Sequence, residues 1–168
     1  MGVELRPMTK EAYAHFYAWS VEQQAKQRME RSGLSWKASH KEAEAEITAM
    51  LPNGMETKDH LLMSIVADGV TVGFVWTLHE MTNGRKQSFL CDFAIWEEKR
   101  RRGYGSEALR LAEENAAMAG CVESVLYVAD DNTAARRMYE KCGYRTLRQA
   151  GGGEYMMKDI FVAKEHKL

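Results

Sequence analysis

The chain has 168 residues, of which 45% are hydrophobic and 28% are charged, and its 23 basic and 24 acidic side chains leave a formal net charge of −1. The length is typical of one domain with its own core, and the balanced charge argues against broad binding to nucleic acid or to a membrane surface. No apolar run approaches the roughly 20 residues that span a bilayer, and Met1 to Arg6 carry no apolar signal segment. We therefore expect a soluble, cytoplasmic protein with a single domain over residues 1–168.

The cysteines and histidines follow no pattern typical of a disulfide framework or a metal site. The three cysteines are odd in number and far apart, and none forms a CxxC pair. The five histidines show no metal-ligand spacing: His15, His40, His60, His79 and His166. We expect no structural disulfide and no metal.

The first third of the chain predicts a short strand and two helices. Val3 to Met8 is expected to form the strand. From Lys10 to Ser32, apolar side chains recur at steps of three and four residues, as in an amphipathic helix, and Gly33 is a candidate C-cap. Ser39 is expected to open the second helix, which ends before Pro52.

The remainder predicts an antiparallel meander followed by alternating helices and strands. Asn83-Gly84 is a strong hairpin signal between two of the strands. The expected strands are 60–67, 70–79, 87–96, 122–129, 144–148 and 155–162, and the expected helices are 103–119 and 132–141. The fold class is therefore α/β (α+β), with a mixed central sheet of six to seven strands flanked by about four helices.

The segment from Arg100 to Ser106 favours phosphate binding. Backbone N–H groups at the start of a helix have no partners within the helix and lie at its positive end. Gly103 and Gly105 remove side chains, so that a phosphate can approach the backbone, and three arginines add positive charge. The alternative is an ordinary turn capped by solvated arginines.

A dinucleotide-binding oxidoreductase is a second functional alternative. Gly103-x-Gly105-x-x-Ala108 formally satisfies the dinucleotide fingerprint, and Glu123 follows 20 residues after Gly103. However, the charged run 97–102 separates the fingerprint from the preceding strand, and Glu123 begins the next strand instead of ending it. Both points count against this reading.

A second motif, Asn132 to Tyr144, accompanies the first. Arg100-x-x-Gly103-x-Gly105 and Asn132-x-x-Ala135-x-x-x-Tyr139-Glu140-Lys141-x-Gly143-Tyr144 stand in order with one strand between them. Together they strongly resemble the two signatures of the GCN5-related N-acetyltransferase (GNAT) superfamily, and the likeness is sharp over 89–144. The resemblance implies a GNAT fold in which a splayed strand pair holds acetyl-CoA.

The resemblance also implies which residues bind acetyl-CoA, here a co-substrate. The backbone amides of the loop would hold the pyrophosphate, the strand at 93–95 would pair with the pantetheine arm, and Asn132 would contact the cofactor from the opposite side. The expected set is Phe93, Ala94, Ile95, Arg100, Arg101, Arg102, Gly103, Tyr104, Gly105, Ser106, Asn132 and Ala135.

Two residues are candidates for the chemistry. The resemblance implies that Tyr139 lies near the sulfur as general acid, and a phenol with a pKa near 10 suits protonation of a thiolate; the alternative is a half-buried structural tyrosine. Strict alternation along the strand predicts that Asp92 shares a face with Leu90, Ala94 and Trp96. A carboxylate in so apolar a strand needs a partner or a task, so Asp92 is either the general base, a substrate anchor or a satisfied structural group.

The acceptor is the least defined part of the prediction. In the family such a helical pair walls the acceptor pocket, so we expect this role of residues 10–51. Most of their aromatic side chains are expected in the core and one or two in the pocket lining, out of Trp19, Trp36, Tyr13 and Tyr17. The segment 89–107 is particularly similar to polyamine acetyltransferases, but Cys91 replaces the glutamate that usually stands there, which argues against a polyamine. A nucleophilic role for Cys91 is unsupported, since strand cysteines usually just pack.

We therefore predict an N-acetyltransferase that moves an acetyl group from acetyl-CoA to a primary amine of a small molecule or peptide by direct attack. Two alternatives stay open: a GNAT-fold CoA-binding or regulatory module without catalysis and, more remotely, the oxidoreductase. The predicted partners include no nucleic acid and no membrane. The last strand resembles one that can shape a dimer interface, which leaves a homodimer open.

Overall fold

The computed structural model describes residues 2–160, so the expectations for Val162 and His166 lie outside the described residues. The elements are, in chain order, β1 (Val3–Pro7), α1 (Lys10–Ser32), α2 (Trp36–Met50), β2 (His60–Ala67), β3 (Val70–Thr82), β4 (Arg85–Ile95), α3 (Tyr104–Met118), β5 (Glu123–Ala129), α4 (Thr133–Lys141), β6 (Arg145–Ala150) and β7 (Gly153–Asp159). Short 3₁₀ turns follow α2 and β4, at Gly54–Glu56 and Glu97–Lys99.

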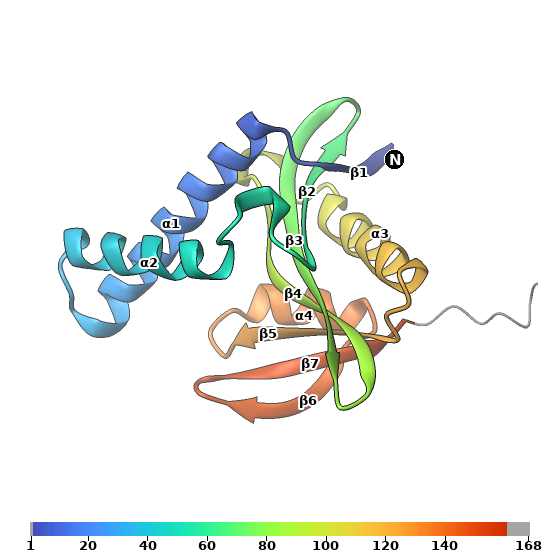
Figure 1. Cartoon of the computed structure of the whole chain (residues 1–168). Coiled ribbons are helices and arrows are strands. Elements are labelled where there is room, and N and C mark those ends of the chain that lie inside the picture. Colours follow the sequence, from blue (N-terminus) through green and yellow to red (C-terminus); the bar gives the residue numbers. More distant parts are fainter. Residues whose placement is uncertain (1, 161–168) are drawn as a thin grey trace, which may run out of the picture.

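The strands form one seven-stranded sheet in the order β1-β2-β3-β4-β5-β7-β6 (Figure 1). Every neighbouring pair is antiparallel except β4 and β5, which run parallel. This confirms the predicted mixed sheet with flanking helices. Across residues 2–160, no helix is both long and apolar enough to cross a membrane.

The two faces of the sheet have separate hydrophobic cores. One core joins the sheet to α3 and α4, through residues such as Leu109 and Tyr139. The other joins the opposite face to α1 and α2, through residues such as Phe16 and Ile47. Figure 1 shows α1 and α2 as a pair that extends beyond the sheet on one side. The molecule thus offers a different helical layer on each side of its central strands.

The helix ends follow from local capping, with one correction to the prediction. Gly33 ends α1 with φ 71°, a conformation that glycine adopts without steric cost. The second helix begins at Trp36, not at Ser39, because the Ser35 hydroxyl accepts a hydrogen bond from the N–H of Ala38 (3.1 Å) and caps it. Ser39 is instead a buried residue within the helix.

The hairpins are tighter and longer than predicted. The β3–β4 ladder continues to the pair Thr82–Arg85, so the turn consists of Asn83 and Gly84 alone, both with positive φ (53° and 77°). Similarly, Gly153 already belongs to β7, which leaves a two-glycine turn after β6. In both hairpins, the strands stay paired closer to the turn than the sequence predicted.

A bulge and a divergence of strands define the centre of the sheet. In the β3–β4 register, Trp76 pairs with Asp92 and Thr77 pairs with Leu90, so Cys91 is the extra residue of a bulge. The parallel β4–β5 ladder covers only 87–90 against 123–126. Beyond Leu90, β4 continues along β3 without pairing to β5. The two parallel strands are therefore splayed, as the resemblance implied.

Gly73 allows β3 to lie close to this splayed part of β4. A Cβ at this position would lie 2.1 Å from the carbonyl oxygen of Ala94 and 2.9 Å from the Cα of Ile95, so the backbone itself would have to move. We expect Gly73→Ala to lower the free energy of unfolding by roughly 2–4 kcal/mol, because overpacking against backbone leaves little room to relax. Urea unfolding would measure this. Val70→Ala, a change at a half-exposed position of the same strand, is the control and should cost far less.

Candidate functional site

The loop before α3 presents a row of unpaired backbone amides. Among the described residues, no hydrogen-bond acceptor pairs with the backbone N–H groups of 101–106. Arg101 and Gly103 both have positive φ (65° and 81°), and such alternation turns successive N–H groups toward one side to form an anion-binding concavity. The start of a 15-residue helix adds its positive dipole end. The loop therefore fits a pyrophosphate.

The side chains around the loop suit the same ligand. Arg101 and Arg102 are exposed, and neither forms an ion pair with a described residue. Arg100 instead donates from Nε to the carbonyl oxygen of Ile95 (2.9 Å), which ties the loop to the end of β4. A Cβ on Gly105 would contact Phe93 at 3.6 Å, so this position packs the helix start against β4. Tyr104 packs against the core under α3 and α4, and Ser106 is exposed.

The predicted pantetheine strand, Phe93 to Ile95, has a neighbour on one side only. Its backbone pairs with β3, while β5 has already separated from it. One amide in this stretch, that of Phe93, donates to Asp92 Oδ1 (2.8 Å). An open strand edge beside an amide-rich loop is where an extended, amide-containing arm could lie.

The bulge corrects the predicted face of Asp92. Leu90 belongs to the core under α3 and α4, whereas Ala94 and Trp96 pack on the opposite side, against α1 and α2. Asp92 pairs across the ladder with Trp76, which is in this second core, so Asp92 shares a face with Ala94 and Trp96 but not with Leu90. Strict alternation fails because Cys91 takes up one position without a partner.

The environment of Asp92 is electrostatically costly. Burial raises the pKa of its carboxyl to about 6, and the hydrogen bond from the Phe93 amide only partly offsets this. The carboxyl forms no ion pair with a described residue. A half-buried carboxyl group with a raised pKa and no cation partner, where two strands diverge, is a candidate functional group.

Tyr139 lies near Asp92, on α4. Its side chain is buried, and its ring packs edge-on against Tyr144, with the ring centroids 5.9 Å apart. Burial raises the pKa of its hydroxyl to about 12, and the negative charge of Asp92 contributes to the rise. The pKa of this hydroxyl thus lies above the ordinary phenol value near 10, and the hydroxyl keeps its proton throughout the physiological range.

A polar network that the sequence did not reveal fixes the ring behind Tyr139. The Tyr144 hydroxyl lies 2.9 Å from Glu113 Oε2 and 2.7 Å from Ser124 Oγ, and Lys158 Nζ donates to Glu113 Oε1 (2.7 Å). Glu113 is only 8% exposed, which is tolerable for a carboxylate because it is paired in this way. The network joins α3, β5, β7 and the end of α4, so it holds the segment that carries Tyr139.

Asn132 and Ala135 begin α4 on the other side of the divergence. The Asn132 side chain caps the helix by accepting a hydrogen bond from the N–H of Ala135 (3.3 Å). Asn132 is exposed, and Ala135 packs against the core. Both thus have structural roles in the described residues, and neither role prevents contact with a ligand.

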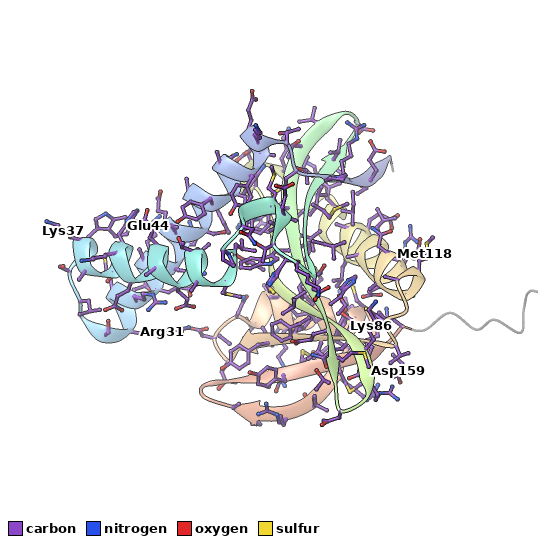
Figure 2. All side chains as sticks on the ribbon, in the orientation of Figure 1. Arg31, Lys37, Glu44, Lys86, Met118 and Asp159 are labelled. Carbon is purple, nitrogen blue, oxygen red and sulfur yellow. The ribbon has the colours of Figure 1, made fainter. Side chains whose placement is uncertain are left out.

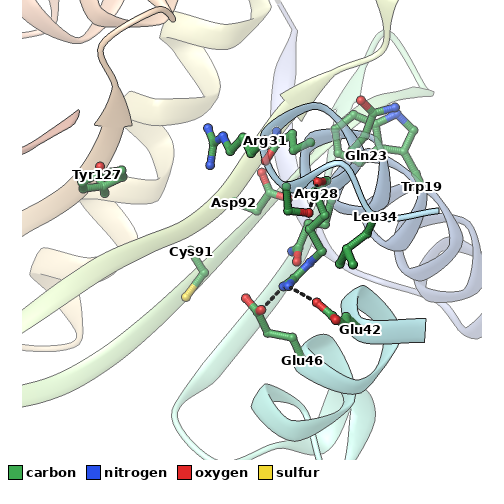
Figure 3. Close-up of a pocket in the computed structure, with 13 residues that line it drawn as sticks. Trp19, Gln23, Arg28, Arg31, Leu34, Glu42, Glu46, Cys91, Asp92 and Tyr127 are labelled. Carbon is green, nitrogen blue, oxygen red and sulfur yellow. Dashed lines mark hydrogen bonds and ion pairs between the residues drawn. The ribbon is translucent and has the colours of Figure 1, made fainter. Parts of the chain in front are cut away.

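A pocket of about 690 Å³ opens at the divergence of β4 and β5, on the side of the helical pair. Cys91, Asp92 and Tyr127 line one part of it, and Trp19 and other residues of α1 and α2 line the rest. Figure 3 shows the two parts facing each other. The volume is that of a small-molecule site. The prediction that the helical pair contains such a lining aromatic residue agrees with this geometry.

The pocket also contains charges that the sequence did not single out. Arg28 of α1 pairs with Glu42 (3.3 Å) and with Glu46, which lie one turn apart on α2. Arg31 lines the pocket without an acidic partner among the described residues. The spacing Arg28–Arg31 and Glu42–Glu46 is visible in the sequence, but only the packing of the two helices shows that these side chains meet.

Cys91 lines the same pocket but is poorly suited to nucleophilic attack. Burial raises the pKa of its thiol to about 12, and the charge of Asp92 adds to this effect. The thiol therefore stays protonated near neutrality, whereas the thiolate is the reactive form.

Known proteins share this fold and these motifs. Residues 17–144 match the Acetyltransferase (GNAT) family. An uncharacterized N-acetyltransferase of Bacillus subtilis (strain 168), YdgE, is 29% identical over 145 residues, which cover 86% of this chain and 92% of that protein.

Solved structures agree with the sequence comparison. The crystal structure of the acetyltransferase YycN from Bacillus subtilis is 25% identical and superposes with a TM-score of 0.81, covering 89% of this chain and 96% of that one. The PaiA N-acetyltransferase of Thermoplasma acidophilum, solved in complex with coenzyme A, has the same fold, with a TM-score of 0.70 at 20% identity over 95% of this chain and 99% of that one.

The raised pKa of Asp92 predicts that this residue lowers stability at neutral pH. Because the folded pKa (about 6) exceeds the ordinary value of 3.8, folding favours the protonated form, and this contribution is lost as the pH rises through 6. A difference of about two pKa units corresponds to roughly 2–3 kcal/mol. We therefore expect Asp92→Asn to be more stable than the wild type by this amount at pH 7 and about equally stable near pH 4.

Urea unfolding at the two pH values would measure this difference. Asp131→Asn, a change to an exposed carboxylate, is the matched control and should shift stability little at either pH. Equal stability of Asp92→Asn and the wild type at pH 7 would contradict the electrostatic assignment.

Proposed function

The chain belongs to the GNAT acetyltransferase family, and on this basis we propose that it transfers an acetyl group from acetyl-CoA to a primary amine by direct attack in a ternary complex. The observation that carries the proposal is the row of unpaired amides at 101–106, which opens beside the divergence of β4 and β5 where Asp92 and Tyr139 lie. The binding core would be 89–144, and the helical pair at 10–51 would wall the acceptor side of a single domain.

The proposed binding mode uses both sides of the divergence. The amides from Arg101 to Ser106 would hold the pyrophosphate of acetyl-CoA, with the exposed guanidinium groups nearby. The open edge of Phe93 to Ile95 would pair with the pantetheine arm as an added strand does. Asn132 and Ala135 would contact the arm from the opposite side. A groove of about 450 Å³ that runs from Gly103 along α3 leaves space beside the loop.

Acetyl-CoA would supply the activated acetyl group as a thioester. The acceptor amine forms the new C–N bond as the C–S bond breaks. Asp92, directly or through a water molecule, takes the proton that the ammonium group must lose, and it is mainly ionised at pH 7 because its pKa is about 6. Tyr139 holds a proton that it can deliver to the departing sulfur. The nitrogen loses a second proton as the C–N bond forms, and that proton returns through water to the Tyr139 oxygen. The products are then a neutral thiol and a neutral amide, with Tyr139 restored and one proton held by Asp92.

Direct attack is favoured over an acyl-enzyme. Cys91 is the only cysteine among the lining residues of the pocket, and its thiol pKa of about 12 keeps it protonated. A covalent route would need an adjacent base to activate it. Asp92 stands next to it in the chain, but its charge raises the thiol pKa further.

Removing the Tyr139 hydroxyl tests the proposed general acid. We expect Tyr139→Phe to lower kcat by about 100-fold or more, which is the usual contribution of proton transfer, while the Kd for acetyl-CoA changes little. Release of CoA thiol in the presence of an amine panel would measure kcat, and calorimetry would measure Kd. An unchanged kcat in Tyr139→Phe would contradict this assignment.

The pH dependence of the reaction tests the proposed general base. In the wild type, kcat/KM should rise with pH through about 6 as Asp92 ionises, and this rise should disappear in Asp92→Asn.

Blocking the amide row tests the cofactor site. Gly103→Glu places a side chain and a negative charge beside the amides, so we expect acetyl-CoA binding to disappear. The matched control is Gly69→Glu, because Gly69 also has positive φ (80°), no atom lies within 4 Å of its added Cβ, and it lines neither the pocket nor the groove. Thermal unfolding would show that both variants fold.

Two results with the wild-type protein would support the alternative functions. Binding of acetyl-CoA without thiol release with any amine would support the non-catalytic CoA-binding module. Binding of NADH in preference to acetyl-CoA would support the oxidoreductase.

A further inference from the structure

The charges of the pocket point to one class of acceptor. Resting on the proposed acetyl transfer, we infer that the acceptor is a small amine that also carries a carboxylate, with its amine at Asp92 and its carboxylate at Arg31. Amino acids and other amino carboxylates have this chemistry.

The two pocket-lining carboxylates of the helical wall, Glu42 and Glu46, already pair with an arginine. Arg28 pairs with both Glu42 and Glu46, and its own side chain is less exposed than theirs (28% against 52% and 53%). The single guanidinium thus lies between the two carboxylates and offsets one of their two negative charges. A polyamine would need free carboxylates along its length, and this wall offers none that is without a cation.

Arg31 is the complementary feature. It lies three residues after Arg28 on α1 and lines the same pocket, but no described carboxylate pairs with it. Figure 3 shows its guanidinium turned away from the Arg28 cluster, toward the part of the pocket that holds Asp92 and Tyr127. In Figure 2 the same side chain extends from the helical pair toward the C-terminal half of the sheet. A guanidinium without an acidic partner can bind a carboxylate through two parallel hydrogen bonds.

The two ends of the pocket therefore differ in charge. Asp92 forms an acidic point at the strand divergence, where an ammonium group must arrive to react. Arg31 forms a basic point on the wall, and the neutral amides of Gln23 and Gln27 lie on the same helix. A ligand with one ammonium and one carboxylate matches both points, whereas a diamine would place a second cation against Arg31. The volume of about 690 Å³ admits an amino acid or a short peptide.

The test compares acceptors that differ only in the group remote from the amine. The set is 5-aminopentanoate, pentylamine and 1,5-diaminopentane, with CoA thiol release as the readout. We expect the wild type to prefer the carboxylate, then the neutral amine, then the diamine. Arg31→Gln should raise KM for 5-aminopentanoate by about 10- to 100-fold, as for loss of a charge-assisted pair, and change the values for pentylamine by less than about threefold. Arg31→Glu should reverse the order in favour of the diamine.

A matched control and a second source of the carboxylate complete the design. Lys37→Gln removes one positive charge at the exposed outer end of α2, outside the pocket, and should leave all three acceptors unchanged (Figure 2). Free amino acids, compared with dipeptides whose C-termini are free or amidated, distinguish an amino acid from a peptide as the carrier of the carboxylate. A wild-type preference for the diamine, or an equal loss for all three acceptors in Arg31→Gln, would overturn the inference.

Failure of the proposed function has a different signature. Absence of thiol release with every amine, despite binding of acetyl-CoA, would count against acetyl transfer itself. Saturation-transfer NMR on the CoA complex then tests the inference separately. Binding of 5-aminopentanoate that weakens in Arg31→Gln but not in Lys37→Gln supports the carboxylate site, and equal binding of 5-aminopentanoate by the wild type and Arg31→Gln refutes it.

Discussion

The candidate site depends on a parallel ladder that ends after four residue pairs. β4 and β5 are joined only over 87–90 and 123–126, and the rest of β4 pairs with β3 alone. Every other feature of the site follows from this. The free edge at Phe93 to Ile95 and the part of the pocket lined by Asp92 both lie beyond the fourth pair. A ladder continued to Ala129 would fill this space with backbone.

The energetic cost of the site falls largely on one carboxyl group. Asp92 is half-buried and has no cation partner, and its pKa of about 6 reflects the free energy lost when it ionises in the folded state. The two fully buried carboxylates avoid this cost because they are paired: Lys158 and Tyr144 bond to Glu113, and Arg136 pairs with Glu154. Ionised Glu113 is thus stabilised by its partners in the fold, whereas ionised Asp92 lowers the stability of the folded state. A destabilising charged group of this kind is typical of functional residues.

The sequence predicted the fold class, most element positions and the glycine-containing loop before α3, because each depends on local patterns. Helix periodicity, the Asn83-Gly84 turn and the glycines before α3 are all read within a few residues. The face of Asp92 was predicted wrongly since the bulge at Cys91 depends on the register with β3, which is not local. The predicted start of α2 was wrong because serine is an equally good cap at 35 and at 39, and in the structure it is the Ser35 hydroxyl that accepts the N–H of Ala38. The meeting of Arg28 with Glu42 and Glu46 likewise needs the packing of two helices.

The two hydrophobic cores lie on opposite faces of the sheet, and they divide the molecule by task. The core under α3 and α4 supports the loop and Tyr139, whereas the core under α1 and α2 supports the wall that carries Arg28 and Arg31. Substitutions on the wall can therefore accumulate without disturbing the packing of the cofactor side. Under the proposed function, such a division would let acceptor choice change in an evolving lineage while acetyl-CoA binding is kept, so that descendants of one ancestor acquire new substrates by changing a single helical pair.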